Sequence, residues 1–150
     1  MKPFSSYIGK MINFLGAIFM SLLALTTFFQ VINRFILRYP YSWTEELSRF
    51  LFIWVTLIGT VICVRDDTHI QIDLLYNKLA PKIQRIVSLI INIIFLTIAI
   101  IIFWQGIEIL QFIKFQKAAS LKLSMIWIYI SSPICFLFII FYLVLRIKKS

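Results

Sequence analysis

Ionisable and metal-binding residues are scarce in this chain. Of its 150 residues only 14% are charged, six are Asp or Glu, and the one histidine is His69. One histidine cannot supply the ligand cluster of a metal site, and a haem held inside a helical bundle usually needs a histidine there. Cys63 and Cys135 both fall within apolar runs, which argues against a disulfide framework. We therefore expect no metal, no cofactor and no catalytic residue.

Long apolar runs are what the sequence has instead, since 61% of its residues are hydrophobic. Lys10 and Arg34 enclose 23 uncharged residues, Arg85 and Glu108 enclose 22, and Lys122 and Arg146 enclose 23. A helix needs about 20 such residues to cross a bilayer, so each run suffices alone. A shorter run of 15 residues lies at 50–64. All four runs are continuous rather than alternating, which disfavours β-strands.

The sequence thus predicts an all-α membrane protein with four transmembrane helices. We expect a single four-helix domain over residues 1–150 and no soluble domain. Its spans are expected at about 11–33, 43–64, 82–113 and 124–145.

The net charge of +9 indicates membrane topology rather than nucleic-acid binding, because the cations lie at the ends of the runs. With the N-terminus inside, nine Lys and Arg residues fall on the inner side and six on the outer side. The positive-inside rule then predicts that both termini are cytoplasmic, in a bacterial inner membrane. The first run exceeds the 7–15-residue core of a signal peptide, so we expect it to stay as an anchor.

Charged residues lie directly before the shortest run, at Glu45, Glu46 and Arg49. The 15 residues that follow cover about 22 Å of helix, whereas the hydrocarbon core is about 30 Å thick. A crossing helix must therefore draw these charges to the lipid edge. Either carboxylate can reach Arg49 along one helix face. We expect a partner polypeptide to receive this charged rim.

The inner loop after the second span has helical signals of its own. Thr68 and Gln71 have the spacing of a capping box, and apolar residues then recur at helical spacing up to Leu79. This predicts a short amphipathic segment on the inner membrane surface between the second and third spans. His69 and Asp73, four residues apart, can pair on its polar side.

Two further features concern the last spans. The third, at 82–113, would be about 48 Å long as a helix, and we expect it to tilt or to protrude on the outer side. The fourth contains Pro133, and we expect Ser131 and Ser132 to help satisfy the backbone groups that this proline frees.

The residues between 43 and 73 carry a family resemblance. Their pattern reads Trp43-x-Glu45-Glu46-x-x-Arg49, then Trp54-x-x-x-x-Gly59 within the span, then Arg65-x-x-x-His69-Ile70-x-x-Asp73. Together with four spans in about 150 residues, this resembles the small membrane subunit of tripartite ATP-independent periplasmic (TRAP) transporters.

The resemblance implies a three-part importer of organic acids such as C4-dicarboxylates, keto acids or sialic acid. A soluble periplasmic binding protein delivers the substrate, a large sodium-coupled membrane subunit carries it, and the small subunit is a scaffold in the bilayer. The residues agree with that division, because no acidic residue stands at the centre of any span, where a carrier would need polar ligands.

The candidate site residues form three groups under this resemblance. The predicted contact with the large subunit comprises Glu45, Glu46, Arg49 and Glu108. The predicted docking surface for the binding protein comprises Arg38, Lys114, Lys117 and Lys122. The three lysines can equally be solvated residues that only set the membrane topology. The predicted structural fastening of the inner loop comprises Arg65, His69 and Asp73.

One function from a different class stays open at this point. A self-sufficient small exporter could act as a homodimer and use an acidic residue as its proton carrier. Glu108 is the natural candidate, but it lies near a membrane edge rather than at the centre of a span.

Overall fold

The computed structural model describes residues 2–36, 38, 41–66 and 81–148. Its helices confirm the predicted all-α class, with four helical segments long and apolar enough to cross a membrane. They are α1 (Lys2–Phe35), α2 (Ser42–Arg65), α4 (Pro81–Ile113), and α5 (Ile126–Tyr129) followed directly by α6 (Ser131–Ile147). The predicted amphipathic segment after the second span lies outside the described residues.

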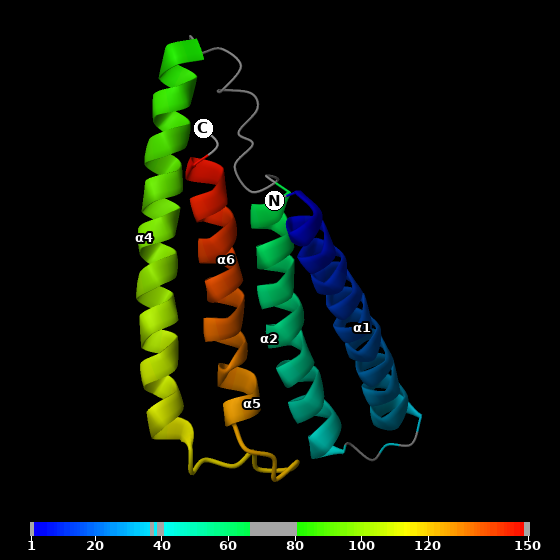
Figure 1. Ribbon diagram of the computed structural model, residues 1–150. Coiled ribbons are helices and arrows are strands. Elements are labelled where there is room, and N and C mark those ends of the chain that lie inside the picture. Colours follow the sequence, from blue (N-terminus) through cyan, green and yellow to red (C-terminus); the bar gives the residue numbers. More distant parts are fainter. Residues whose placement is uncertain (1, 37, 39–40, 67–80, 149–150) are drawn as a thin grey trace.

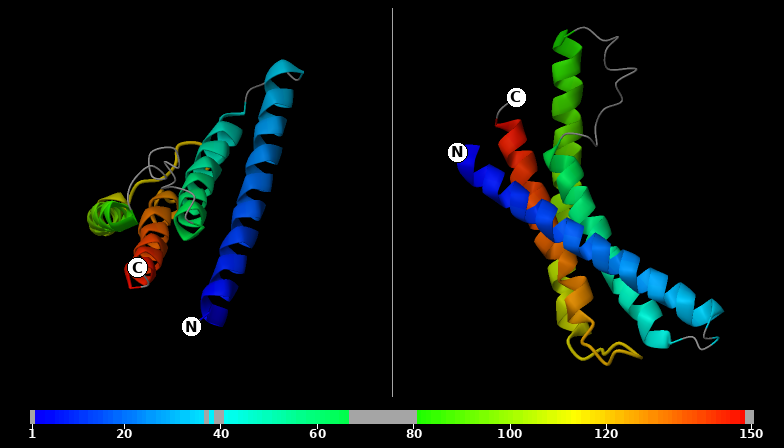
Figure 2. Two further views of the ribbon diagram at one scale, coloured as in Figure 1. Left: turned by 90° about the horizontal axis from the view of Figure 1, so that it is seen from above. Right: turned by 90° about the vertical axis from the view of Figure 1, so that its right-hand side faces the viewer.

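The helices stand side by side in a row rather than in a closed bundle. The order across the row is α1, α2, α6 and α4, and each helix packs mainly on its neighbours (Figures 1 and 2). Helix α1 lies obliquely across α2. The start of α1 and the end of α6 share one end of the row, here called the terminal end; the end of α1, the start of α2 and the segment 114–125 lie at the other, the loop end.

Because the row is one helix thick, most of its apolar side chains are exposed. In the most apolar stretch of α1 no residue is buried, against 39% in that of the fourth span. The small core runs along the contact of α2 with α6, around Val61 and Leu143. Two broad apolar faces of this kind require lipid or another protein to cover them.

Local sequence signals account for the helix ends. Tyr41 is extended and precedes α2, and both the backbone N–H and the hydroxyl of Thr44 donate to its carbonyl. Pro81 opens α4, a position where its missing N–H costs little. The fourth span is interrupted at Ile130, three residues before Pro133, and the Ser131 hydroxyl donates to the Ile128 carbonyl there.

Helices α4 and α6 are antiparallel, and their register shows where α4 extends beyond its neighbour. Gly106 lies against Pro133, so Asn92 comes level with Ile147, the last residue of α6. Residues 81–91 therefore pass the end of α6 by about 16 Å, at the terminal end (Figure 1). The close packing of Gly106 on Pro133 fixes this register, and the expected tilt or protrusion of the third span beyond the lipid on the outer side stays a prediction.

Candidate functional site

The Glu46 side chain, in the second turn of α2, binds backbone rather than arginine. Its Oε1 accepts the N–H of Ala119 at 3.0 Å, and its Oε2 accepts those of Ser120 and Leu121 at 2.9 and 2.8 Å. A carboxylate that accepts several N–H groups makes strong, charge-assisted bonds. Glu46 thereby ties the loop between α4 and α5 to the start of α2.

That loop, residues 114–125, has a regular hydrogen-bond pattern of its own. Lys117 and Ser124 form an isolated β-bridge, and the Ala118 N–H donates to the Leu123 carbonyl at 2.8 Å. Lys122 adopts a left-handed backbone conformation (φ 54°), and its N–H donates to the Ala118 carbonyl at 3.1 Å. Ala118 is itself buried. These bonds and the Glu46 carboxylate together hold the loop in one shape.

The predicted docking residues are all exposed at the loop end. Lys114, Lys117 and Lys122 belong to the Glu46-bound loop, whereas Arg38 belongs to the connection between α1 and α2. Arg38 also has a left-handed backbone (φ 52°). Cations that share one end of the molecule create a positive potential that reaches about 8 Å into physiological salt solution.

The other predicted contact residues occupy two separate places. Arg49 Nη2 lies 3.4 Å from Glu45 Oε1, and their side chains are 70% and 66% exposed. Such an exposed pair stabilises a helix by less than about 1 kcal/mol. Glu108 is also exposed, but it lies on α4, and α6 stands between α4 and α2 in the row. The structure thus brings Glu45 and Arg49 together and leaves Glu108 apart from them.

Trp54 joins three helices at the middle of the row, a role that the sequence analysis missed. Its indole N–H donates to the Trp127 carbonyl of α5 at 3.0 Å. Its ring stacks on Phe19 of α1 with the centroids 5.3 Å apart. Two sequence signals point to this residue: Trp54 belongs to the pattern of the family resemblance, and it lies in mid-span, away from the headgroup level where tryptophan is usual.

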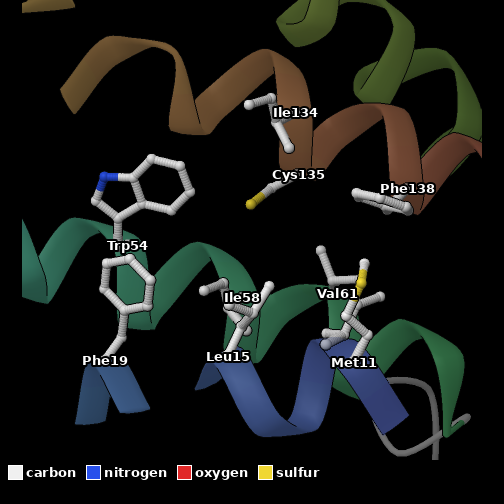
Figure 3. A pocket seen from close by; sticks show the side chains of 10 residues that line it. Met11, Leu15, Phe19, Trp54, Ile58, Val61, Ile134, Cys135 and Phe138 are labelled. Carbon is white, nitrogen blue, oxygen red and sulfur yellow. The ribbon is translucent and has the colours of Figure 1, made fainter. Parts of the chain in front are cut away.

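A cavity of about 80 Å³ lies beside Trp54, between α1, α2 and α6 (Figure 3). Met11, Leu15 and Phe19 point into it from α1, and Cys135 and Phe138 point into it from α6. The lining offers no polar surface. A carboxylate or sulfonate bound there would lose its hydration without any compensating hydrogen bond. This cavity is therefore unsuited to an organic anion.

Arg65 joins α1 and α2 at the terminal end. Its Nη1 donates to the Gly9 carbonyl at 2.9 Å, and its Nε and Nη2 donate to Asp66 at 2.7 and 2.9 Å. The hydrogen bonds from Arg65 lower the pKa of the Asp66 carboxyl below its ordinary value. His69 and Asp73, predicted with Arg65 as fastening residues, lie outside the described residues. Within the described part of the chain, no three His, Cys, Asp or Glu side chains are placed to hold a metal ion.

Comparison with known proteins identifies the family. The model of the family described as "Tripartite ATP-independent periplasmic transporters, DctQ component" matches residues 23–150. The chain is 31% identical over 126 residues to the sialic acid TRAP transporter small permease protein SiaQ of Vibrio cholerae. The aligned region covers 81% of this chain and 69% of that protein.

Two longer relatives match as well. The isethionate TRAP transporter permease protein DctMQ of Oleidesulfovibrio alaskensis is 28% identical over 116 residues, which are 72% of this chain and 18% of that protein. The sialic acid TRAP transporter permease protein SiaT of Haemophilus influenzae is 28% identical over 140 residues, 90% of this chain and 22% of that protein. The chain thus spans only about a fifth of these two relatives. The family match, the SiaQ likeness and the four apolar helices agree: this chain is a multi-pass membrane protein and belongs to the small permease (DctQ) component of TRAP transporters, a family of transporters rather than enzymes.

Proposed function

We propose that this chain is the scaffold component of a TRAP importer and that a larger membrane subunit carries the substrate. The observation that supports it best is the open row of helices, one helix thick, with two apolar faces and a small core. One face suffices for lipid, and the other offers a surface for a second membrane protein. The centres of the spans contain no charged residue to bind an ion or an anion.

The relatives support a large membrane partner for this surface. Two permease proteins contain a region similar to this chain, and that region makes up only about a fifth of each protein. We propose that a separate large subunit supplies the corresponding remainder here, including the substrate site and the coupling to sodium. The names of the relatives refer to isethionate, sialic acid and C4-dicarboxylate, all organic anions, so we propose an organic anion as the substrate.

We further propose that the terminal end is cytoplasmic and the loop end periplasmic, in the bacterial inner membrane. This orientation follows the positive-inside rule: with both termini inside, nine Lys and Arg residues of the sequence fall on the cytoplasmic side and six on the periplasmic side. It places the Glu46-bound loop on the side where a soluble binding protein would arrive. Glu45, Arg49 and Glu108 are the proposed contacts with the large subunit, and Glu46 contributes by holding the loop beside them.

Substitution at the exposed pair tests the proposed contact. Glu45→Ala or Arg49→Ala is expected to lower recovery of this chain with a tagged large subunit in mild detergent, at least about fivefold. The reason is that removing one member of an ion pair that docking has buried costs about 3–5 kcal/mol. Membrane insertion of the chain alone is expected to be unchanged.

Lys10→Ala is the matched control, because Lys10 is an exposed cation near the opposite end of the row. It is expected to recover the large subunit as the unaltered chain does. Full recovery by both rim variants would refute the assignment of Glu45 and Arg49.

A further inference from the structure

An aromatic side chain projects from the Glu46-bound loop among its cations. Phe115 is 92% exposed, the largest value among the large apolar side chains of the described residues. Lys114 precedes it, and Lys117 and Lys122 follow in the same loop. From residue 109 to residue 150 the sequence has no Asp or Glu. The loop therefore combines an apolar group with cationic side chains, and the Glu46 carboxylate reaches its backbone from α2.

The shape of this loop is fixed before any partner arrives. Three consecutive N–H groups, those of residues 119–121, are held by the Glu46 carboxylate. The bridge of Lys117 with Ser124 and the left-handed Lys122 set the turn between them. A preformed loop loses little conformational entropy on binding, and this favours affinity. A lipid anchor would need the exposed phenylalanine but not the fixed backbone.

We propose that the loop 114–125 is a preformed docking element for an acidic protein surface with an apolar recess. Its occupant is the soluble binding protein, and this rests on the proposed function, which puts the loop end in the periplasm. Phe115 enters the recess, and the three lysines face carboxylates around it, an arrangement that steers encounter by complementary charge. Glu46 is a positioning residue, because it acts on the partner only through the loop.

The experiment uses the complex of this chain with its large subunit in lipid nanodiscs. Binding of the purified cognate binding protein is followed by biolayer interferometry. Phe115→Ala is expected to raise the Kd about tenfold, as expected for a central aromatic anchor. Phe112→Ala is the control: Phe112 is 75% exposed in the last turn of α4, and its loss is expected to change the Kd less than about twofold.

Substitution of Glu46 tests its positioning role. The amide of Glu46→Gln has one acceptor oxygen where the carboxylate has two, so the loop loses part of its fastening. Trypsin is expected to cleave the assembled Glu46→Gln complex faster after Lys117 and Lys122, and the Kd of that complex for the binding protein is expected to rise at least about threefold. If Glu46 only stabilised the loop, Glu46→Gln would speed tryptic cleavage and leave the Kd for the binding protein unchanged.

The results separate the docking proposal from the proposed function. A complex that assembles and transports, yet binds the binding protein equally well with Phe115→Ala and with Glu46→Gln, would overturn the docking element and leave the scaffold role standing. Failure to assemble with a large subunit at all would overturn the scaffold role. Unchanged Kd with weaker binding of the Phe115→Ala chain to protein-free vesicles would identify Phe115 as a lipid anchor and also overturn the docking proposal.

Discussion

Gly106→Leu is expected to lower the thermal unfolding midpoint of the purified chain in detergent by about 4–8 °C. A Cβ at Gly106 would lie 3.2 Å from Pro133 Cδ and 3.4 Å from Ser132 Oγ. The proline ring is rigid and cannot yield, so the larger side chain must push α4 away from α6. Overpacking of this kind costs about 1–3 kcal/mol, and each kcal/mol shifts the midpoint by about 2–4 °C in a chain of this size.

Gly59→Leu provides the matched control on α2. A Cβ at Gly59 would meet no heavy atom within 4 Å, so the isolated chain has room for the new side chain. Its unfolding midpoint is expected to stay within about 2 °C of the unaltered chain. An equal loss for both substitutions would show that the contact of α4 with α6 is not the cause.

Arg65→Met is expected to loosen the terminal end of α1 and to destabilise the chain by about 1.5–3 kcal/mol. The Arg65 side chain is only 16% exposed, and it carries the hydrogen bond to the Gly9 carbonyl. Methionine retains the length and the apolar stem but donates no hydrogen bond. Hydrogen exchange at the first turns of α1 is expected to accelerate, because α2 no longer holds them.

Two further substitutions accompany Arg65→Met. Lys10→Met removes an exposed cation at the same end and is expected to leave exchange in α1 unchanged. Gly9→Ala would place a Cβ 3.0 Å from Arg65 Nη1, and the flexible guanidinium can shift, so its effect is expected to be smaller. Exchange in α1 that is as slow in Arg65→Met as in the unaltered chain would contradict the fastening role.

The all-α class with four long apolar helices could be predicted from the sequence because hydrophobic length is a local property. Each crossing needs about 20 apolar residues, and the charges at Lys10, Arg34, Arg85 and Arg146 mark the ends of apolar runs in the sequence. The lateral order of the helices could not be predicted. In a membrane helix the lipid-facing and the protein-facing sides are both apolar, so periodicity does not say which helices are neighbours.

In the candidate site, too, contacts within one helix could be predicted from the sequence and contacts between distant segments could not. The spacing of Glu45 and Arg49 correctly predicted their pair, which depends on the geometry of a single helix. The partner of Glu46 lies 73 to 75 residues away and consists of backbone N–H groups, which every residue except proline has. No side-chain pattern marks such a contact. The packing of Trp54 between three helices was missed for the same reason.

Transport by the purified chain is the most direct test of the scaffold role. The chain alone in proteoliposomes, under sodium and proton gradients, is expected to show no flux of an organic anion above that of empty vesicles. Uptake is expected once the large subunit and the binding protein are added. Robust proton-coupled flux by the chain alone, abolished by Glu108→Gln, would contradict the account and establish a self-sufficient exporter.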